Sequence, residues 1–429
     1  MGPRTIGAIP GWAQYAGTKP PSGKPLDLGH DPARVRGLEA SNEAAERDSP
    51  AGSAHAAART AVTSLKLTDF RNYATLSLSL DERPVVLTGP NGAGKTNLLE
   101  AVSFLSPGRG IRGARIDAVG RQGGDGGWAI AAEVANGDGA VALGTGVMAG
   151  ETRRKVRVNH APAGSSAAFL DHLRVLWLTP AMDGLFTGPP ADRRRFLDRA
   201  VLAIDKTHGT RANAFERAMR GRNRLLAEPA PDSRWLDAIE AEMAGLGVAI
   251  AAARREWAGL AAAMLGDAEA AGPFPTAVIA LDGTLETDLG HLSASAAEDA
   301  YHRRLRDERR RDAAAGRTLA GPHRSDLIVR HGPKDMPAET CSTGEQKALL
   351  VGLVLAQTRL VTRLTGETPV VLLDEIAAHL DETRRAALFD LLTELGCQAF
   401  MTGTDAAVFA PLANRAQAFA VAGGTVHQE

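Results

Sequence analysis

The chain has 429 residues, of which 44% are hydrophobic and 23% are charged, an ordinary composition for a globular protein of two or three domains. Its 49 Lys and Arg residues nearly balance its 50 Asp and Glu residues, which excludes a uniformly basic nucleic-acid coat protein but allows a local basic patch. The two cysteines, Cys341 and Cys397, are too few for a disulfide framework or a four-ligand zinc site.

The N-terminal segment 1–61 is rich in Gly, Pro, Ala, Ser and charged residues and has no sustained apolar period. Such a segment buries too little apolar surface to offset its ordering entropy, so we expect a disordered extension. The segment lacks the charged and apolar regions of a secretory signal, and no uncharged apolar run of about 20 residues is found in the chain. Together with the sparse cysteine, these features predict a cytoplasmic protein.

Beyond this segment, apolar residues that alternate with polar ones predict a series of strands. The expected strands are 65–70, 76–80, 85–87, 128–134, 141–147, 155–158 and 174–179. Gly-rich turns separate the strands between 128 and 158, which is typical of an antiparallel meander. A helix is predicted over 96–105.

The character of the chain changes between residues 191 and 313. Strand signals vanish there and Ala, Leu, Arg and Glu dominate, which predicts a helical insertion. The α/β character returns after Leu319. The apolar run Pro369–Leu373 is typical of a strand that is covered on both faces.

A glycine-rich loop follows the apolar run 85–87. The phosphate-binding pattern G-x-x-x-x-G-K-[ST] is matched in full by Gly89, Pro90, Asn91, Gly92, Ala93, Gly94, Lys95 and Thr96. Glycines let the loop present backbone N–H groups to phosphate oxygens, and the helix that follows adds its positive end. We expect Lys95 to reach the β- and γ-phosphates of ATP and Thr96 to coordinate Mg²⁺. The competing interpretation is a chance Gly-rich turn.

Two acidic residues end the apolar strand predicted over 370–373. Asp374 is expected to hold Mg²⁺, and Glu375 is expected to be the catalytic residue that polarises the attacking water. In-line attack on a γ-phosphate requires a placed water and charge neutralisation more than covalent help. A strand that stops at two solvated acids is the competing interpretation.

A third motif, Ser342-Thr343-Gly344-Glu345, precedes an apolar run. Ser342 as N-cap and Glu345 at the third helical position form a capping box, and capping is the simpler interpretation of the motif taken alone. A Ser-x-Gly at a helix start, shortly before an Asp-Glu strand, also resembles the signature of ABC-type ATPases. The hydroxyl of Ser342, the N–H group of Gly344 and the positive end of the helix dipole would all favour binding of an anion at this position.

The ABC resemblance implies that the signature completes the nucleotide site of a second subunit. ATP is then held between the phosphate-binding loop of one chain and Ser342, Gly344 and Glu345 of the other, in an ATP-dependent homodimer. Asp381 stands where these ATPases have their D-loop aspartate. Where many of them have a histidine that senses the γ-phosphate, this chain offers Thr402 or Thr404. A Q-loop glutamine could not be assigned, since Gln122 is available but its Gly-rich setting does not single it out.

The insertion between the loop and the signature is too long for a transport ATPase, and it lacks the sustained heptads of a long coiled coil. Together with the stretches 67–73, 185–198 and 321–327, this organisation resembles the RecF family over residues 62–429. The resemblance implies an α/β fold: an ABC-type, Rad50/SMC-like P-loop ATPase head with an antiparallel β subdomain and an inserted helical lobe. Its expected parts are 1–61 (extension), 62–190 (first part of the ATPase lobe), 191–313 (helical lobe) and 314–429 (remainder of the ATPase lobe).

The same resemblance implies a weak ATPase that dimerises with ATP on duplex DNA near single-strand gaps. It implies partnership with RecR and RecO in loading RecA, and roles in DNA repair, replication and the SOS response. The alternative is an ABC-type ATPase subunit of a transporter. A second alternative is a module that uses ATP only to hold a dimer together, which conflicts with the presence of Glu375.

Two arginine clusters are candidates for phosphate contacts with DNA, Arg193–Arg195 and Arg303–Arg311. Acidic residues lie among them, so ion pairs on helix surfaces explain part of the pattern, and the first cluster is also a candidate anchor between the lobes. His323 with Arg324 is either a nucleotide sensor or a structural turn. Arg71 is a candidate phosphate contact.

Overall fold

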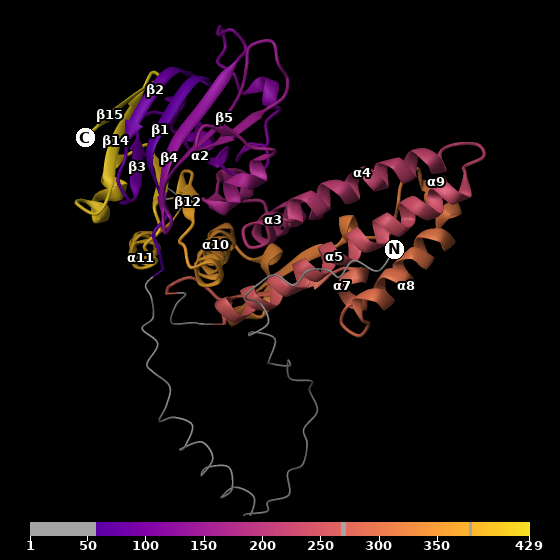
Figure 1. Ribbon diagram of the computed structural model, residues 1–429. Helices are drawn as coiled ribbons and strands as arrows, with labels where there is room; N and C mark the ends of the chain where they lie inside the picture. Colours follow the sequence, from indigo (N-terminus) through magenta and orange to yellow (C-terminus); the bar gives the residue numbers. More distant parts are fainter. Residues whose placement is uncertain (1–56, 267–271, 377–379) are drawn as a thin grey trace, which may run out of the picture. The chain divides into compact units, whose positions relative to one another are not determined.

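The computed structural model describes residues 57–266, 272–376 and 380–429 (Figure 1). The extension expected over 1–61 therefore lies almost entirely outside the described residues. The first strand begins at Ala61, and just before it Ala58 forms a parallel bridge with Glu367.

An antiparallel sheet forms the N-terminal part, as the alternating pattern predicted. Its strands, in spatial order, are β2 (Tyr73–Ser79), β1 (Ala61–Phe70), β4 (Trp128–Asn136), β5 (Gly139–Val147), β6 (Lys155–Val158) and β7 (Ala161–Pro162). The strands β4 to β6 form the predicted meander. One face of the sheet is buried: Phe70 and Trp128 pack edge to face with ring centroids 5.9 Å apart, next to Phe104 at the end of helix α2 (Lys95–Ser103).

A second, mostly parallel sheet forms the centre of the head. Its order is β15 (Thr425–Gln428), β14 (Gln417–Ala422), β3 (Val85–Thr88), β13 (Ala399–Gly403), β12 (Val370–Leu373) and β8 (Val175–Leu178). Only β15 runs antiparallel to its neighbour. As predicted for β12, both faces are covered: Val370 and Leu372 pack with α2 and the antiparallel sheet, whereas Val371 and Leu373 pack in the other core, with helix α10 (Thr343–Thr365).

The segment between the two parts of the head is largely helical. It contains α3 (Pro190–Leu202), α4 (His208–Leu226), α5 (Ser233–Leu265), α7 (Thr284–Asp288), α8 (Ala294–Asp307) and α9 (Arg309–Ala315). We call α3 to α9 the helical lobe. In Figure 1 it extends away from the sheets, with α4 and α8 on opposite sides of α5.

One expectation for this segment was wrong. A strand, β9 (Ala277–Asp282), lies where strand signals were judged absent, and it pairs antiparallel with β10 (Asp326–His331), which also pairs with β11 (Met336–Pro337). Alanines weaken the alternating pattern of β9, and its partner lies about 50 residues further along the chain. Its existence is therefore decided by a non-local pairing rather than by local propensity. The division of the chain into four segments remains a prediction.

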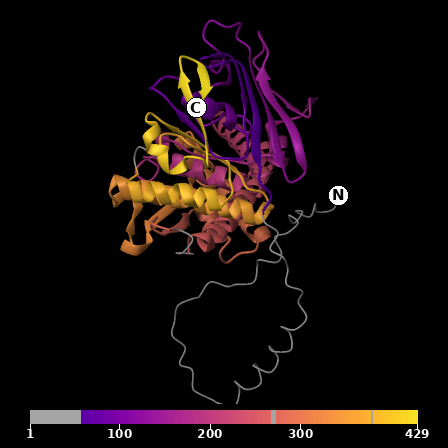
Figure 2. The ribbon, with the colours of Figure 1, turned by 90° about the vertical axis from the view of Figure 1, so that its left-hand side faces the viewer.

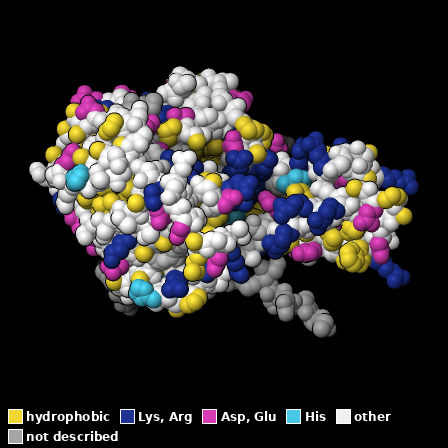
Figure 3. All heavy atoms as spheres, turned by 90° about the horizontal axis from the view of Figure 1, so that it is seen from above, with side chains coloured by type: hydrophobic (Ala, Val, Ile, Leu, Met, Phe, Trp, Pro, Cys, Tyr) yellow, Lys and Arg dark blue, Asp and Glu magenta, His cyan; other side chains and the backbone are white. Residues whose placement is uncertain are grey.

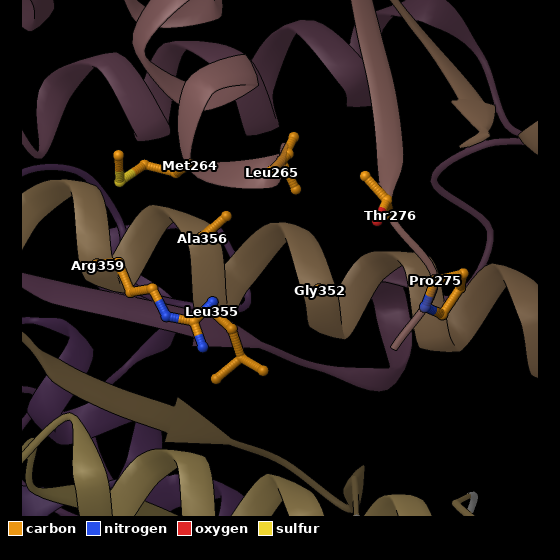
Figure 4. A pocket seen from close by; sticks show the side chains of 8 residues that line it. All are labelled: Met264, Leu265, Pro275, Thr276, Gly352, Leu355, Ala356 and Arg359. Atoms are coloured by element: carbon orange, nitrogen blue, oxygen red, sulfur yellow. The ribbon is translucent and has the colours of Figure 1, made fainter. Parts of the chain in front are cut away.

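Helix α10 runs through the protein below the sheets (Figure 2). The next helix along the chain is α11 (Glu382–Glu394). Helix α10 is the one helix among the described residues with the length and mean hydropathy, 1.3, of a membrane span, yet 67% of that stretch is buried inside the protein. Trp257 of α5 donates a hydrogen bond of 2.7 Å to Gln357 of α10. A small, mainly apolar pocket lies where α10 meets the end of α5 and the start of β9 (Figure 4).

Candidate nucleotide-binding site

The predicted phosphate-binding loop joins the C-terminal end of the central strand β3 to helix α2. Gly89 and Gly94 have φ values of 137° and 119°, which side chains rarely adopt. A Cβ atom at Gly89 would lie 2.2 Å from the carbonyl oxygen of Val421, and one at Gly94 would lie 2.6 Å from the hydroxyl of Tyr73. Backbone conformation and close packing therefore both require glycine at these two positions.

The N-terminus of α2 is open to an anion. Its N-cap residue is Gly94, which offers no capping side chain, and the first turn contains no acidic residue. The backbone N–H groups of that turn and the positive end of the helix dipole are thus left to whatever binds in the loop.

Lys95 is 4% exposed and lies folded back over the loop. Its ammonium donates hydrogen bonds to the carbonyl oxygens of Gly89 (2.6 Å) and Pro90 (2.9 Å). Burial lowers the pKa of Lys95, while the nearby carboxylates of Glu375 and Asp374 oppose that shift. The ammonium is already desolvated at the loop, so it can exchange two carbonyl oxygens for phosphate oxygens at little further cost.

A hydroxyl pair converges on the carboxylate at the end of β12. Thr96 donates to Oδ1 of Asp374 at 3.0 Å, and Thr402 donates to the same oxygen at 2.8 Å. Thr402 comes from β13, which separates β3 from β12 in the sheet. The edge where these parallel strands end therefore brings together the predicted Mg²⁺ residues Thr96 and Asp374.

Thr402 also holds the neighbouring residue, Glu375. The backbone N–H of Glu375 donates to the Thr402 hydroxyl at 2.8 Å, and Glu375 has a left-handed φ of 53°. Such a conformation costs a non-glycine residue roughly 1–3 kcal/mol and persists where the surroundings impose it. The Glu375 side chain is half-buried, and its carboxylate makes no hydrogen bond or ion pair with another described residue.

The signature motif forms the predicted capping box. The Ser342 hydroxyl accepts from the Glu345 N–H at 3.4 Å, and the Glu345 carboxylate accepts from the Ser342 N–H at 3.0 Å. The ion pair with Lys334, followed by the hydrogen bonds that the N–H and the hydroxyl of Ser342 donate to the carboxylate, lowers the pKa of Glu345 to about 2. Ser342 and Gly344 are exposed, so the start of α10 is accessible on the surface.

Asp381 is the N-cap residue of α11. Its carboxylate accepts a hydrogen bond of 2.8 Å from the Arg384 N–H and remains exposed. N-capping of α11 is therefore the role of Asp381 within a single chain. Its exposure leaves it available to a second chain.

Arg71 is engaged within the chain rather than turned toward the loop. Its guanidinium makes two hydrogen bonds, 2.6 and 2.8 Å long, to the fully buried carboxylate of Glu100 on α2. Arg112 pairs with the same carboxylate at 2.6 Å. Neither Glu100 nor Arg112 was predicted from the sequence, and an acid at a buried position of a predicted helix is the signal that could have found them.

Of the two candidate γ-phosphate sensors, Thr402 is fully buried in the network above and Thr404 is exposed. Gln122, the available Q-loop glutamine, lies in an exposed turn before β4.

His323 bonds through Nε2 to the carbonyl oxygen of Thr318 at 2.9 Å, and burial lowers its pKa. These contacts favour the structural-turn interpretation of His323.

The first arginine cluster divides into anchors and a surface residue. Arg193 pairs with Asp326 on β10 at 2.7 Å, and Arg194 donates to the Ser325 carbonyl oxygen at 2.9 Å. Both residues thus tie α3 to the segment after the helical lobe, as the anchoring alternative held. Arg195 is 78% exposed and pairs with Asp192.

Ion pairs occupy part of the second cluster. Arg309 pairs with Asp237 and Glu240 on α5, and Arg306 also pairs with Asp237. Arg303 and Arg310 are exposed. Only some members of the Arg303–Arg311 run are therefore open to a ligand.

Comparison with known proteins identifies the family. The family model described as RecF/RecN/SMC N terminal domain matches residues 61–426. Proteins named "DNA replication and repair protein RecF" from Mesorhizobium japonicum and Rhizobium meliloti are 59% and 60% identical to this chain, over 86% and 85% of its length and 98% of theirs.

Solved structures agree on the fold. The recombination mediator protein RecF of the RecFOR pathway, solved with ATPrS, matches with a TM-score of 0.77 at 21% identity, over 87% of this chain and 100% of that one. An Smc head domain from Pyrococcus furiosus matches with a TM-score of 0.50 at 16% identity, over 86% and 96%. These likenesses confirm the expected SMC-like P-loop head. The chain belongs to the RecF family of DNA replication and repair proteins.

Proposed function

We propose that this chain binds ATP and Mg²⁺, hydrolyses ATP slowly, and uses the nucleotide to form a homodimer on DNA. The observation that carries the proposal is the convergence of Lys95, Thr96 and Asp374 at one edge of the parallel sheet, with Glu375 held beside them. Membership of the RecF family sets aside the transporter-subunit alternative.

The residues present fit a nucleotide. Gly89 and Gly94 occupy conformations that leave no room for side chains, the α2 N-terminus is uncapped, and the Lys95 ammonium is buried among carbonyl oxygens. The Thr96 hydroxyl and the Asp374 carboxylate, 3.0 Å apart, are hard oxygen ligands of the kind that Mg²⁺ prefers. When bound, the ion would supply charge neutralisation at the β- and γ-phosphates.

Each residue then has a defined task. Lys95 binds phosphate oxygens, Thr96 and Asp374 hold the metal, and Glu375 orients and polarises the water that attacks the γ-phosphate. Thr402 is a positioning residue, because it is buried behind Asp374 and Glu375 and bonds to both. Of the two candidates for the γ-phosphate sensor, Thr402 or Thr404, the first is thus assigned a supporting role.

The nucleotide site would be completed by a second copy of the chain. Ser342 and Gly344 are exposed at the start of α10, where their hydroxyl, N–H group and helix dipole suit an anion. Glu345 fixes the conformation of this turn through the capping box, and Asp381 is exposed at the start of α11. We infer that these four residues contact the nucleotide bound by the partner chain.

The family supports the wider biological assignment. Its members are named for DNA replication and repair, and the RecF of solved structure is described as a recombination mediator of the RecFOR pathway. We extend this to the present chain: it acts in the cytoplasm on duplex DNA near single-strand gaps, with RecR and RecO, in support of RecA loading and the SOS response. The division into an ATPase lobe, 62–190 with 314–429, and a helical lobe, 191–313, belongs to the same proposal.

Light scattering of the Glu375→Gln variant tests the proposal, with and without ATP-Mg²⁺ and a gapped duplex. Because Gln keeps the shape of Glu but cannot polarise the water, the variant should bind ATP, accumulate as a dimer and bind the duplex more tightly. A monomer that ignores both ligands would refute the ATP-dependent dimer. Hydrolysis at the wild-type rate would refute the catalytic role of Glu375.

A further inference from the structure

Helix α4 has one face buried in the helical lobe and an opposite face exposed. The residues that face inward are Phe215, Ala218, Arg222 and Leu226. At about 100° per residue, Arg217, Arg220 and Arg224 fall within about 60° of one another on the opposite side. All three are exposed, and we call them the α4 arginine ridge.

The ridge carries positive charge that the described residues neutralise only in part. The only acidic residue of α4 is Glu216, which pairs with Arg220 at 3.3 Å. Both side chains of that pair are about 60% exposed, so the attraction between them is weak. Arg217 and Arg224 have no ion pair or side-chain hydrogen bond with any described residue.

The other two arginines of α4, in contrast, form ion pairs with acidic residues of the protein. Arg222 is fully buried and pairs with Glu240 at 2.9 Å and with Asp312 at 2.6 Å. Arg211 pairs with Asp205 just before the helix. The helix thus has structural arginines on one face and exposed arginines on the other, of which only Arg220 has an ion pair, in a chain whose net charge is −1.

The shape of the ridge suits a phosphate backbone. Arg224 lies seven positions after Arg217 in the helix, which places them about 10 Å apart along the axis, the rise of about three base pairs. Within α4, which the structure describes in full, the only aromatic residue is the buried Phe215. The ridge therefore offers charge without a stacking surface, which favours a duplex over a single strand.

Further basic side chains lie on the surface around the ridge. Figure 3 views the protein from the side on which α4 lies and shows Lys and Arg side chains gathered along the helical lobe and at its junction with the rest of the protein. Helix α8 lies on the other side of α5 from α4 (Figure 1), and its Arg306 is paired with Asp237. The ridge and α8 can therefore be tested separately as binding surfaces.

We propose that the α4 arginine ridge binds the phosphate backbone of duplex DNA. The inference rests on the proposed function and names the surface through which the helical lobe contacts the duplex. It moves the expected contact from Arg303–Arg311 to a helix that the sequence pattern did not single out.

The test compares two full-length variants that each lose three positive charges. R217A/R220A/R224A removes the ridge, and R303A/R304A/R306A removes three arginines of α8. Arg→Ala substitutions on exposed helix positions slightly favour the helix, so the ridge variant is expected to fold. Binding of a fluorescent duplex, and of a single strand of equal length, is measured by anisotropy with ATP-Mg²⁺ between 50 and 200 mM salt.

Each lost phosphate contact should reduce the slope of log affinity against log salt by about 0.9, or about 2.7 for the three contacts of one chain. The advantage of wild type over the ridge variant should then shrink about 40-fold between 50 and 200 mM salt. The α8 variant should keep the wild-type slope. A triple Arg→Lys ridge variant should also keep it, because lysine supplies the same charge to a phosphate.

The possible outcomes distinguish failure of the ridge assignment from failure of the proposed function. If the ridge variant keeps the wild-type slope on duplex, or if only the α8 variant or only single-strand binding loses it, the ridge assignment is wrong. Unchanged ATP affinity and ATP-driven dimerisation in the ridge variant show that the nucleotide site is intact. If wild type itself fails to bind duplex with ATP, the proposed function fails.

Discussion

Replacing Thr402 with Val tests the positioning network behind the proposed catalytic residue. Valine keeps the shape of threonine and suits strand β13, but it has no hydroxyl. The change removes the acceptor for the Glu375 N–H and one of the two hydroxyl donors to Asp374. Both hydrogen bonds are 2.8 Å long, and the Thr402 side chain that makes them is fully buried. Asp374 retains its second donor, Thr96, at 3.0 Å.

The expected loss in the free energy of unfolding can be estimated from these two hydrogen bonds. A buried N–H left without a partner costs about 1–3 kcal/mol, and a lost bond to a carboxylate adds about 1.5–3 kcal/mol, reduced by the remaining donor. Burial of the new methyl group returns about 0.8 kcal/mol. We therefore expect a net loss of about 2–4 kcal/mol, which at about 2.1 cal/mol/K per residue lowers Tm by about 3–5 °C.

The catalytic effect should be larger than the effect on ATP binding. Without its backbone bond, Glu375 loses the constraint on its left-handed conformation, and misplacement of a catalytic group by about 1 Å costs up to about 100-fold in rate. We expect hydrolysis to fall roughly 10- to 100-fold while ATP affinity, measured by calorimetry, changes little. Thr402→Ser, which keeps the hydroxyl, is the matched control and should hydrolyse ATP at close to the wild-type rate.

Two results would contradict this reasoning. A Val variant with wild-type Tm and hydrolysis would show that the hydroxyl has no positioning role. Equal loss of activity in the Val and Ser variants would show that the methyl group and its packing, rather than the two hydrogen bonds, are what matters at this position.

Three further predictions concern the two halves of the nucleotide site. Lys95→Ala removes two charged hydrogen bonds of about 1.5–3 kcal/mol each, so ATP affinity should fall at least about 100-fold in calorimetry, and an unchanged affinity would contradict the role of Lys95. Ser342→Arg should leave ATP binding by the monomer intact and abolish ATP-driven dimers in light scattering, whereas normal dimers would sink the cross-subunit model. Because the pKa of Glu345 is lowered to about 2 in the folded chain, Glu345 stabilises the fold above its ordinary pKa of 4.5, and this contribution is lost as the pH falls toward 2. Glu345→Gln should therefore lower the urea midpoint more at pH 6 than at pH 3.5, and an equal difference at both would contradict the capping and ion-pair assignment.

Local sequence patterns were sufficient to predict much of the ATPase head. The phosphate-binding loop was predicted because its glycines, Lys95 and Thr96 are contiguous, and the structure confirms its strand and helix on either side. The meander followed from two-residue alternation, and the capping box followed from the spacing of Ser342 and Glu345. Each of these features depends on residues within a few positions of one another, so a single sequence contains the whole signal.

Features that need distant partners were missed or left open. β9 has an Ala-rich sequence and exists because it pairs with β10, and Arg71 is directed to Glu100 across 29 residues. Arg193 was counted as a DNA candidate, although Asp326, 133 residues away, holds it as an anchor. In each case the identity of the residue was visible in the sequence, but the partner that decides its role was not.

The sequence by itself determined that this is a P-loop protein of the RecF type, because the chemistry of phosphate and metal binding is written in short contiguous motifs. Only the tertiary structure decided which residues support that chemistry. It inserts β13 between β3 and β12, so Thr402 reaches both Asp374 and Glu375. It also buries one face of α4 and thereby leaves the arginine ridge on the other, since burial is a property of packed elements and not of their order along the chain.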